Sequence, residues 1–384
     1  MHVIFNLLPR PPVIFGNGAS YRTGMKVKEL GCDKVLLVFD QGIKNAGIAD
    51  KIHDNLSKAG IQVITFDGVV SDPSDDVVEE GAKLARENKV QGVIGLGGGS
   101  SLDAAKAINI LLTNSSPVSQ YYGINPPMNK VKPLVLIPTT AGTGSEMTTV
   151  SMVSDTEKNL KMNILSPNCL PTTAIVDPEL TLRLPSQVTA ETGIDTLSHA
   201  VESYLSNQSN YMTDLLNEQS IKLTFDNLPQ AVKDENDLTA RENMSFSSMI
   251  AGIAFSNSMV HLGHAIAHAL GTAAKLSHGL GCALALPLTI EYLSQEVPER
   301  VKKIGDIMGL ELDEGLSSED LGQNVGDNIR YFIRDLGLPG TIVEAGLDEE
   351  TLKQVAKLTA IDNSQIFAPK SASSQEVMEL FGKP

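Results

Sequence analysis

Residues 90–106 read VQGVIGLGGGSSLDAAK: an apolar run, three consecutive glycines, and then a segment with helical spacing. Val90–Ile94 predicts a strand, and Ser101–Leu112 predicts the helix that follows it. Glycines at such a turn let backbone N–H groups approach a phosphate, and the helix N-terminus attracts its charge. A glycine-rich turn can also be purely structural, but the strand before it and the helix after it favour phosphate binding. The residues that we interpret as a dinucleotide-phosphate loop are Gly97, Gly98, Gly99 and Ser100.

The acidic residue that usually accompanies such a loop is found elsewhere in this sequence. From Gly95 the loop reads G-x-G-x-x-S, which is close to the dinucleotide fingerprint without matching it, and no acid follows about 20 positions later. Asp40 instead ends an earlier predicted strand, Lys34–Phe39. Its carboxylate can accept hydrogen bonds from both ribose hydroxyls and would repel a 2′-phosphate, so Asp40 favours NAD over NADP.

A second loop of small and hydroxylated residues follows the predicted strand Leu134–Ile137. Residues 138–146 read PTTAGTGSE and lack the G-K-[ST] ending of a Walker loop. The carboxyl ends of strands are where an open α/β sheet binds its ligand. Two such loops in one domain therefore support the same nucleotide-binding interpretation.

Strand-like and helix-like segments alternate through the first half of the chain, which predicts a Rossmann-like parallel sheet with helices on both faces. After Pro185 the pattern is almost entirely helical, with Ser186 as the expected N-cap. We therefore expect an α/β dinucleotide-binding domain at residues 1–185 and an all-helical domain at residues 186–384. The other expected strands are Ile61–Phe66 and Thr173–Val176, and the other expected helices are Gly47–Ala59 and Ser74–Asn88.

The composition excludes several classes of partner. The 384 residues carry a net charge of −16, which argues against a nucleic-acid partner. The first residues lack the basic region of a secretory signal, and the most apolar helix, expected at Met249–Leu270, holds too many polar groups to cross a membrane. Three scattered cysteines, Cys32, Cys169 and Cys282, form neither a disulfide framework nor a thiolate metal site. We expect buried free thiols in a reducing cytoplasm.

Five of the seven histidines lie between positions 199 and 278. Asp195 and His199 are four apart in a helical pattern, so their side chains share one face, and Glu202 falls on the same polar side. The expected helix Met249–Leu270, which Gly271 would stop, carries Asn257, His261, His264 and His268 on one stripe. His278 follows in an expected loop.

One carboxylate and several imidazoles from separate helices predict a divalent-metal site in the helical domain. The ligand types allow Fe²⁺, Zn²⁺, Mn²⁺ or Co²⁺ and do not choose among them. The alternative is that these histidines are buried core or interface residues that bind nothing. Placing several imidazoles on one stripe of an apolar helix without a shared role is costly, so we favour the metal site.

Taken together and in this order, these motifs resemble the iron-containing (group III) alcohol dehydrogenases, from about Pro12 to the C-terminus. The stretches that carry the resemblance are residues 97–100 with Asp103 and Lys106, residues 139–146, Gly193-Ile194-Asp195 with His199, Ala251-Gly252 through Phe255-Ser256-Asn257, His264 with His268, and His278-Gly279.

The resemblance implies roles for individual residues. The expected metal ligands are Asp195, His199, His264 and His278, with Fe²⁺ as the expected ion and Zn²⁺ as the alternative. His268 is expected to relay protons as the catalytic residue. The expected cofactor contacts, besides Asp40 and Gly97, are Gly98, Gly99, Ser100, Asp103, Thr139, Thr140, Thr148, Lys161 and Leu180. Asp72 departs from the asparagine usual in this family, and His261 stands in a bulkier stretch than usual, where we favour a packing role over a place in a substrate pocket.

The activity implied is that of a metal-dependent, NAD(H)-linked alcohol dehydrogenase or aldehyde reductase acting on short primary alcohols, diols or their aldehydes. A divalent metal would acidify the alcohol, and the alkoxide would give its hydride to nicotinamide. We expect a homodimer or a larger homo-oligomer.

Three alternatives stay open from the sequence. A lyase similar to dehydroquinate synthase would need a basic pocket, and only Lys275 lies near the metal helices. A metal-dependent hydrolase would leave the two glycine loops unexplained. A structural, filament-forming role would leave the complete metal set without a purpose.

Overall fold

The computed structural model describes residues 5–7, 10–158 and 160–382. The chain divides into two compact units, one formed by residues 10–182 and the other by residues 183–382 together with residues 5–7. The first is an α/β unit and the second is helical, as the sequence predicts.

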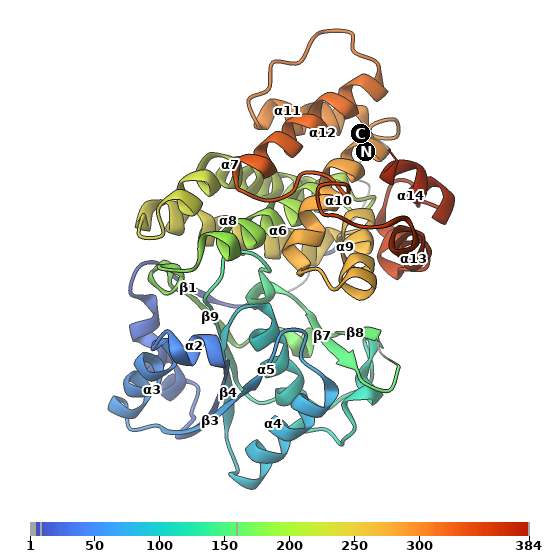
Figure 1. Cartoon of the computed structure of the whole chain (residues 1–384). Coiled ribbons are helices and arrows are strands. Elements are labelled where there is room, and N and C mark those ends of the chain that lie inside the picture. Colours follow the sequence, from blue (N-terminus) through green and yellow to red (C-terminus); the bar gives the residue numbers. More distant parts are fainter. Residues whose placement is uncertain (1–4, 8–9, 159, 383–384) are drawn as a thin grey trace. The chain divides into compact units, whose positions relative to one another are not determined.

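The α/β unit is built on a six-stranded, fully parallel sheet with the strand order β1-β9-β6-β4-β2-β3 (Figure 1). Strand β2 leads to β3 on one side, and the chain then returns to place β4 on the other side of β2. The strands are β1 (Val13–Phe15), β2 (Lys34–Asp40), β3 (Gln62–Val69), β4 (Gly92–Gly97), β6 (Leu134–Pro138) and β9 (Thr173–Val176).

Helices cover both faces of this sheet because successive strand residues point to opposite sides. Leu36 and Val38 of β2 pack with the helices of one core cluster, whereas Leu37 and Phe39 pack in a second cluster. The helices are α1 (Thr23–Glu29), α2 (Gln41–Asn45), α3 (Ile48–Lys58), α4 (Asp75–Glu87) and α5 (Gly99–Leu111), with short 3₁₀ turns at Ala19–Arg22, Val118–Tyr121, Ser145–Met147, Pro167–Cys169 and Pro178–Thr181.

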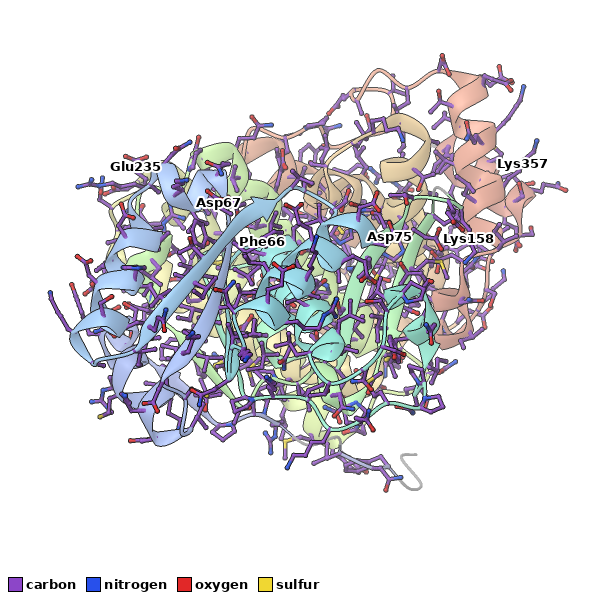
Figure 2. The ribbon with its side chains drawn as sticks, turned by 90° about the horizontal axis from the view of Figure 1, so that it is seen from below. Phe66, Asp67, Asp75, Lys158, Glu235 and Lys357 are labelled. Carbon is purple, nitrogen blue, oxygen red and sulfur yellow. The ribbon has the colours of Figure 1, made fainter. Side chains whose placement is uncertain are left out.

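Two features at the border of the sheet are visible from below the molecule (Figure 2). On the edge strand β3, Phe66 is buried while the neighbouring Asp67 is accessible and pairs with Lys44 at 2.5 Å. A small second sheet, which the sequence did not predict, contains β5 (Gly123–Ile124), β7 (Val150–Asp155) and β8 (Leu160–Leu165). Asp75, the first residue of α4, accepts a hydrogen bond from the backbone N–H of Thr156 just after β7.

The helical unit starts at α6, and Figure 1 shows its helices from green to red. Its helices are α6 (Ser186–Leu205), α7 (Tyr211–Lys233), α8 (Leu238–Ser258), α9 (Leu262–Ala274), α10 (His278–Leu293), α11 (Pro298–Ile307), α12 (Ser318–Asp335), α13 (Glu349–Ala360) and α14 (Ser374–Phe381), with a 3₁₀ turn at Asn363–Phe367. Within the described part of the chain, no helix combines the length and apolarity needed to cross a lipid bilayer.

The single helix expected at Met249–Leu270 is wrong, because the chain leaves the helical conformation between α8 and α9. Met259 adopts φ 67° and ψ 159°, a region that residues other than glycine rarely enter. His261 then becomes the N-cap of α9, and its Nδ1 accepts a hydrogen bond from the Leu262 N–H. The four polar residues expected on one continuous stripe therefore belong to two helices and the break between them.

Three smaller boundary predictions are also wrong. Helix α9 continues past Gly271 and ends at Ala274, and its C-cap Lys275 has a left-handed backbone. His278 is the first residue of α10, with Ser277 as its N-cap, and does not lie in a loop. Ser186 is the first residue of α6, whose N-cap is Pro185.

Candidate functional site

Asp40 and the glycine loop, which are predicted to bind the nucleotide, lie where the sheet reverses its strand order, between β2 and β4. Open parallel sheets bind ligands at such a switch point, beyond the carboxyl ends of the strands. Asp40 ends β2 and Gly97 ends β4. The Asp40 carboxylate accepts hydrogen bonds from the Ser101 hydroxyl at 3.0 Å and from the Ile43 N–H at 3.1 Å. It is therefore held beside the glycine loop, although 57 residues separate Asp40 from Gly97.

The two glycine-containing loops contact each other, because they follow the neighbouring strands β4 and β6. The Thr139 N–H donates to the Gly97 carbonyl at 3.0 Å. A methyl group built on Gly99 would lie 2.7 Å from Thr143, and one built on Gly98 would lie 3.5 Å from Thr140. Glycine at position 99 therefore lets the first loop pack against the threonine side chain of the second loop at the start of α5.

A buried lysine that was not among the predicted contacts organises the second loop. The Lys106 ammonium is fully buried and donates to Ser145 at 2.7 Å, to Thr148 at 3.0 Å and to Asp103 at 3.3 Å. Asp103 also accepts from Ser145 at 2.6 Å. Nearby, burial raises the pKa of Glu146 to about 7. Asp103 and Thr148 are thus engaged inside the protein, which suits positioning of the loop better than direct ligand contact.

The remaining predicted cofactor residues have different surroundings. Lys161 forms an ion pair with Asp72 at 2.7 Å, and the Asp72 N–H donates to the Ser100 hydroxyl at 3.2 Å. The pair therefore connects β8 with the start of α5. Leu180 is buried in the apolar core together with Phe39 and is not grouped with the polar loop residues.

In the helical unit, several predicted ligands converge on one carboxylate oxygen. Asp195 Oδ1 lies 3.6 Å from His199 Nδ1, 3.7 Å from His264 Nε2 and 3.5 Å from His278 Nε2. Asp195, His199 and His264 are all buried. The ligand atoms of Asp195, His264, His278 and Cys282 all lie within 4.8 Å of one another. His199 lies beside this group, with its ring stacked on Phe255 at 4.2 Å between centroids.

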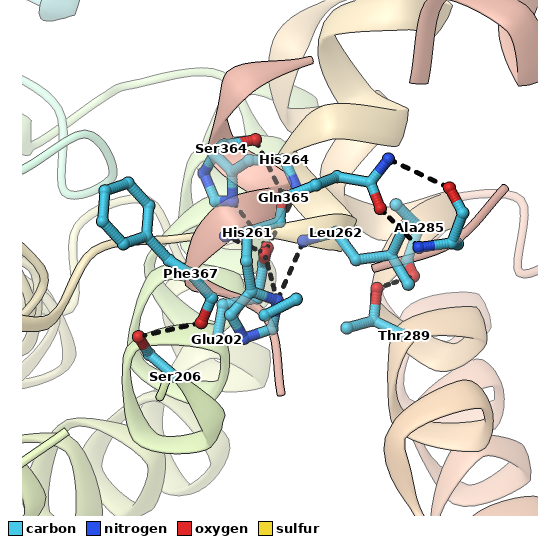
Figure 3. Close-up of polar contacts among 12 residues, drawn as sticks. Glu202, Ser206, His261, Leu262, His264, Ala285, Thr289, Ser364, Gln365 and Phe367 are labelled. Atoms are coloured by element: carbon cyan, nitrogen blue, oxygen red, sulfur yellow. Dashed lines mark hydrogen bonds and ion pairs between the residues drawn. The ribbon is translucent and has the colours of Figure 1, made fainter. Parts of the chain in front are cut away.

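Glu202 holds His264 from behind (Figure 3). Its carboxylate lies 2.6 Å from His264 Nδ1 and accepts hydrogen bonds from the backbone N–H groups of His261 at 2.7 Å and His264 at 3.3 Å. A methyl group on Gly263 would come within 2.5 Å of the same carboxylate, so this approach depends on glycine. With Nδ1 directed to Glu202, only Nε2 of His264 is left to face Asp195.

The charges in the helical unit follow from this arrangement. Burial alone would lower the pKa of His264, but the carboxylates of Glu202 and Asp195 overcome it and raise that pKa to about 10. Burial would raise the pKa of Glu202, yet the contact with His264 lowers it to about 2. For His199, burial prevails over Asp195 and lowers the pKa to about 4. Without a cation, a protonated His264 thus balances part of the charge of the two buried carboxylates, and a divalent ion would take the place of its proton on Nε2.

His268 has a different environment from the buried cluster. Its Nδ1 lies 3.0 Å from an Asp362 carboxylate oxygen, and 29% of its side chain is exposed. Burial lowers the pKa of His268, while Asp362 opposes that shift. Its ring stacks on that of His278 at 5.7 Å between centroids. His261, in contrast, is fully buried at the start of α9, in agreement with a packing role.

A divalent metal ion fits this donor set. His264 Nε2 and His199 Nδ1 are buried and have no hydrogen-bond partner among the described residues. Imidazole nitrogens of this kind are costly to bury unless they bind something. A carboxylate and imidazoles are the ligands that Fe²⁺ and Zn²⁺ accept, and a carboxylate behind a ligating histidine is the usual support.

In the helical unit, three residues beside the cluster were given no role by the sequence interpretation. Cys282 was excluded from any metal site, but its Sγ lies 3.5 Å from Asp195 Oδ1, one turn after His278. Asp362 is distant in sequence from its partner, so no spacing could reveal it. Glu202, placed only on the polar side of its helix, lies seven residues after Asp195, which is the spacing of one helical face.

The fold and these side chains define a class of protein: an enzyme with a glycine-lined nucleotide cradle in one unit and a buried centre of imidazoles and carboxylates in the other. Comparison with known proteins gives the family. The model of the iron-containing alcohol dehydrogenase family matches residues 10–178, and that of the family's C-terminal domain matches residues 189–383. The chain belongs to the iron-containing alcohol dehydrogenase family.

Individual relatives agree along the whole length. The chain is 33% identical to the NAD-dependent methanol dehydrogenase of Bacillus methanolicus, covering 98% of both chains. It is 36% identical to the 1,3-propanediol dehydrogenase of Citrobacter freundii, covering 96% of this chain and 95% of the relative. A crystal structure of a 1,3-propanediol oxidoreductase superposes with a TM-score of 0.94 at 36% identity, covering 99% of each chain. These matches confirm the predicted family and the alcohol dehydrogenase class over the lyase.

Proposed function

We propose that this chain is a metal-dependent, NAD(H)-linked alcohol dehydrogenase or aldehyde reductase that acts on short primary alcohols, diols or their aldehydes. The observation that carries the proposal is the convergence of His199, His264 and His278 on one oxygen of the buried Asp195. The names of the relatives, which include methanol and 1,3-propanediol dehydrogenases, support a small alcohol as the substrate.

The residues proposed to hold the metal are Asp195, His199, His264 and His278, with Fe²⁺ as the expected ion and Zn²⁺ as the alternative. A bound divalent ion supplies Lewis acidity, which polarises the substrate oxygen. The protein contributes position: Glu202 fixes the ring of His264, and Phe255 packs against that of His199. Apolar surroundings exclude water from the buried members of the set.

The proposed cofactor is NAD(H), held in the α/β unit. Gly97, Gly98, Gly99 and Ser100 would receive the pyrophosphate at the start of α5. Asp40 is fixed at the end of β2, where its carboxylate would accept from the ribose hydroxyls and repel a 2′-phosphate. Thr139 and Thr140 line the cradle from the second loop. In this proposal, Lys161 positions the loop through its ion pair with Asp72, and Asp103 does so through its contact with Lys106. Leu180 contributes apolar packing.

His268 is proposed to move the proton that the alcohol releases. Its ring reaches solvent, and Asp362 orients it through Nδ1, which leaves Nε2 for the proton. A histidine oriented by a carboxylate in this way suits general acid–base transfer. The proton would leave through the exposed edge of the ring.

The proposal extends to the cellular compartment and the oligomeric state of the protein. The buried free thiols Cys32 and Cys169 are compatible with a reducing cytoplasm. We propose a homodimer or larger homo-oligomer there, which light scattering of the purified protein would test.

The activity is tested by reconstituting metal-free protein anaerobically with Fe²⁺, Zn²⁺, Mn²⁺ or no metal. NADH oxidation is then followed with 3-hydroxypropanal, lactaldehyde, propanal and butanal. We expect metal-dependent NADH consumption with at least one aldehyde. NADH that binds without any turnover would contradict the reductase, and NADH that does not bind would contradict the nucleotide cradle.

A further inference from the structure

Cys282 faces the proposed metal centre from α10. It lies one helical turn after His278, so both side chains project from the same face of the helix. The thiol is 1% exposed. Its Sγ is 3.5 Å from Asp195 Oδ1 and 3.7 Å from His278 Nε2. A carboxylate, an imidazole and a thiol therefore meet at one point, and no role in the proposed function uses the thiol.

Four separations within this group match the spacing of ligands around one ion, and all of its ligand atoms lie within 4.8 Å of one another. Donors bound 2.0–2.3 Å from a tetrahedral metal lie about 3.3–3.7 Å from one another. The separations from Asp195 Oδ1 to His264 Nε2 and His278 Nε2, 3.7 and 3.5 Å, fall in or at the edge of this range. The separations of Cys282 Sγ from Asp195 Oδ1 and His278 Nε2 fall there as well.

A second observation independently points to a ligand at this place. His264 Nε2 is buried, lies within the same group and has no hydrogen-bond partner among the described residues. Because Glu202 engages Nδ1 from behind, His264 cannot turn this nitrogen elsewhere without losing that contact. An ion at Asp195 accounts for His264 Nε2, and the Cys282 thiol lies among the donors that surround this place.

We propose that the Cys282 thiolate is an additional ligand of the divalent metal ion, beside Asp195, His199, His264 and His278. The inference rests on the proposed function, since it assumes an ion at Asp195. The thiol gives its proton to solvent as the sulfur–metal bond forms, without oxidation or reduction. His199, with Nδ1 3.6 Å from the same Asp195 oxygen, remains a further donor.

A sulfur ligand changes which metals the centre prefers. Thiolates are soft and favour Zn²⁺ and Co²⁺ over Mn²⁺ and Mg²⁺, which favour oxygen. The set of one carboxylate and three imidazoles predicted from the sequence would discriminate less strongly between these metal ions. Cys282 therefore sets metal selectivity in this chain.

The test is a titration of metal-free protein with Co²⁺, followed by absorption spectroscopy. Bound Co²⁺ gives visible d–d bands, and a thiolate ligand adds a charge-transfer band in the near ultraviolet. We expect both in the unmodified protein and in the controls Cys32→Ala and Cys169→Ala, whose thiols are buried in the α/β unit. In Cys282→Ala the d–d bands should remain and the charge-transfer band should vanish.

Each other outcome is decisive. Visible bands without a charge-transfer band in the unmodified protein would overturn the sulfur ligand and leave the metal centre standing. A charge-transfer band that survives in Cys282→Ala would overturn it too. The absence of all bands would refute the metal centre itself, and with it this inference.

Competition between metals gives a second measurement that does not depend on spectra. Loss of even an outer partner of a metal ligand weakens binding by about 10–100-fold, so loss of a direct ligand should cost at least as much. We expect the ratio of the Mn²⁺ and Zn²⁺ dissociation constants to fall by at least about tenfold in Cys282→Ala. Cys282→Ser, which keeps the side-chain size, serves if the alanine variant does not fold. An unchanged ratio in both would contradict the proposal.

Discussion

Glu202 supports the predicted metal ligands although it is not one of them. One oxygen lies against His264 Nδ1, and the other accepts from two N–H groups at the start of α9. A carboxylate that satisfies helix-terminal donors and a ligating ring fixes both the helix and the tautomer of the histidine. The geometry of the metal centre therefore depends on this buried residue.

Glu202→Gln should weaken metal binding without unfolding the protein. An amide has only one acceptor oxygen, so its NH₂ group must face either His264 Nδ1 or the backbone N–H donors. We expect the metal dissociation constant, measured by chelator competition, to rise by about 10–100-fold. The control is Ser203→Ala, which disturbs the adjacent buried contacts with Ser258 and Asn217 but not His264. Equal affinity in both variants would show that Glu202 does not position the ligand.

His268→Ala should lower turnover while the metal content stays near that of the unmodified protein. General acid–base groups contribute about 10²–10⁴-fold, so we expect kcat to fall by about 100-fold. Metal analysis and steady-state kinetics on the same preparation distinguish the roles, because loss of metal would make His268 a ligand or a structural residue.

At the residue scale, sequence patterns found side chains whose partners lie nearby in the same helix or in a recognised motif. Asp195 and His199 share a helical face, and the glycine loop follows its strand. Patterns could not show which residue a single thiol or carboxylate faces. Cys282 meets Asp195, and Asp362 meets His268, only through tertiary packing, so the chemistry of each side chain was visible but its environment was not.

At the element scale, the break between α8 and α9 decides how the metal helices meet. Apolar periodicity continues through Ser258-Met259-Val260, and neither glycine nor proline marks the break, so the sequence favoured one long helix. The break exposes the first N–H groups of α9 and brings those of His261 and His264 to Glu202. Strained backbone beside a functional cluster is a recurring arrangement.

Met259→Gly should be more stable than Met259→Ala. Both substitutions remove the same side-chain packing, but only glycine adopts φ 67° and ψ 159° without strain. Strain of this kind costs about 1–3 kcal/mol. We therefore expect the free energy of unfolding of the glycine variant, measured by urea titration, to exceed that of the alanine variant by about 1 kcal/mol. Ala254→Gly, inside α8, should show the opposite sign. A more stable alanine variant at position 259 would mean that the backbone there is not strained.

At the scale of the whole molecule, the alternation of strands and helices was enough to predict a parallel sheet followed by a helical unit. Buried runs such as Leu134–Ile137 have no alternation, as strands covered on both faces require. The small second sheet was missed because β8 has mixed polarity, and β5 has only two residues. The strand order came from the structure alone, since tertiary packing selects the neighbours.

Because the proposed nucleotide site and the proposed metal site belong to different units, we expect NADH to bind even when the metal is removed. All the proposed NADH contacts lie in residues 10–182, and all the proposed ligands lie in residues 183–382. After exhaustive chelation, the dissociation constant for NADH should stay within about threefold of that of the metal-loaded protein. This corresponds to a difference in binding free energy of less than about 1 kcal/mol. Fluorescence titration of both forms measures this, and NADH binding that required the metal would show that the units do not act separately.

The most direct test of the account joins metal content to turnover in one titration. Metal-free protein is supplied with increasing Fe²⁺ or Zn²⁺ under anaerobic conditions, and bound metal and NADH-dependent aldehyde reduction are measured at each step. We predict that activity rises in proportion to bound metal and reaches its plateau at one ion per chain, and that Asp195→Asn gains neither metal nor activity. Full turnover in metal-free protein, or in Asp195→Asn without bound metal, would contradict the claim that this centre performs the chemistry.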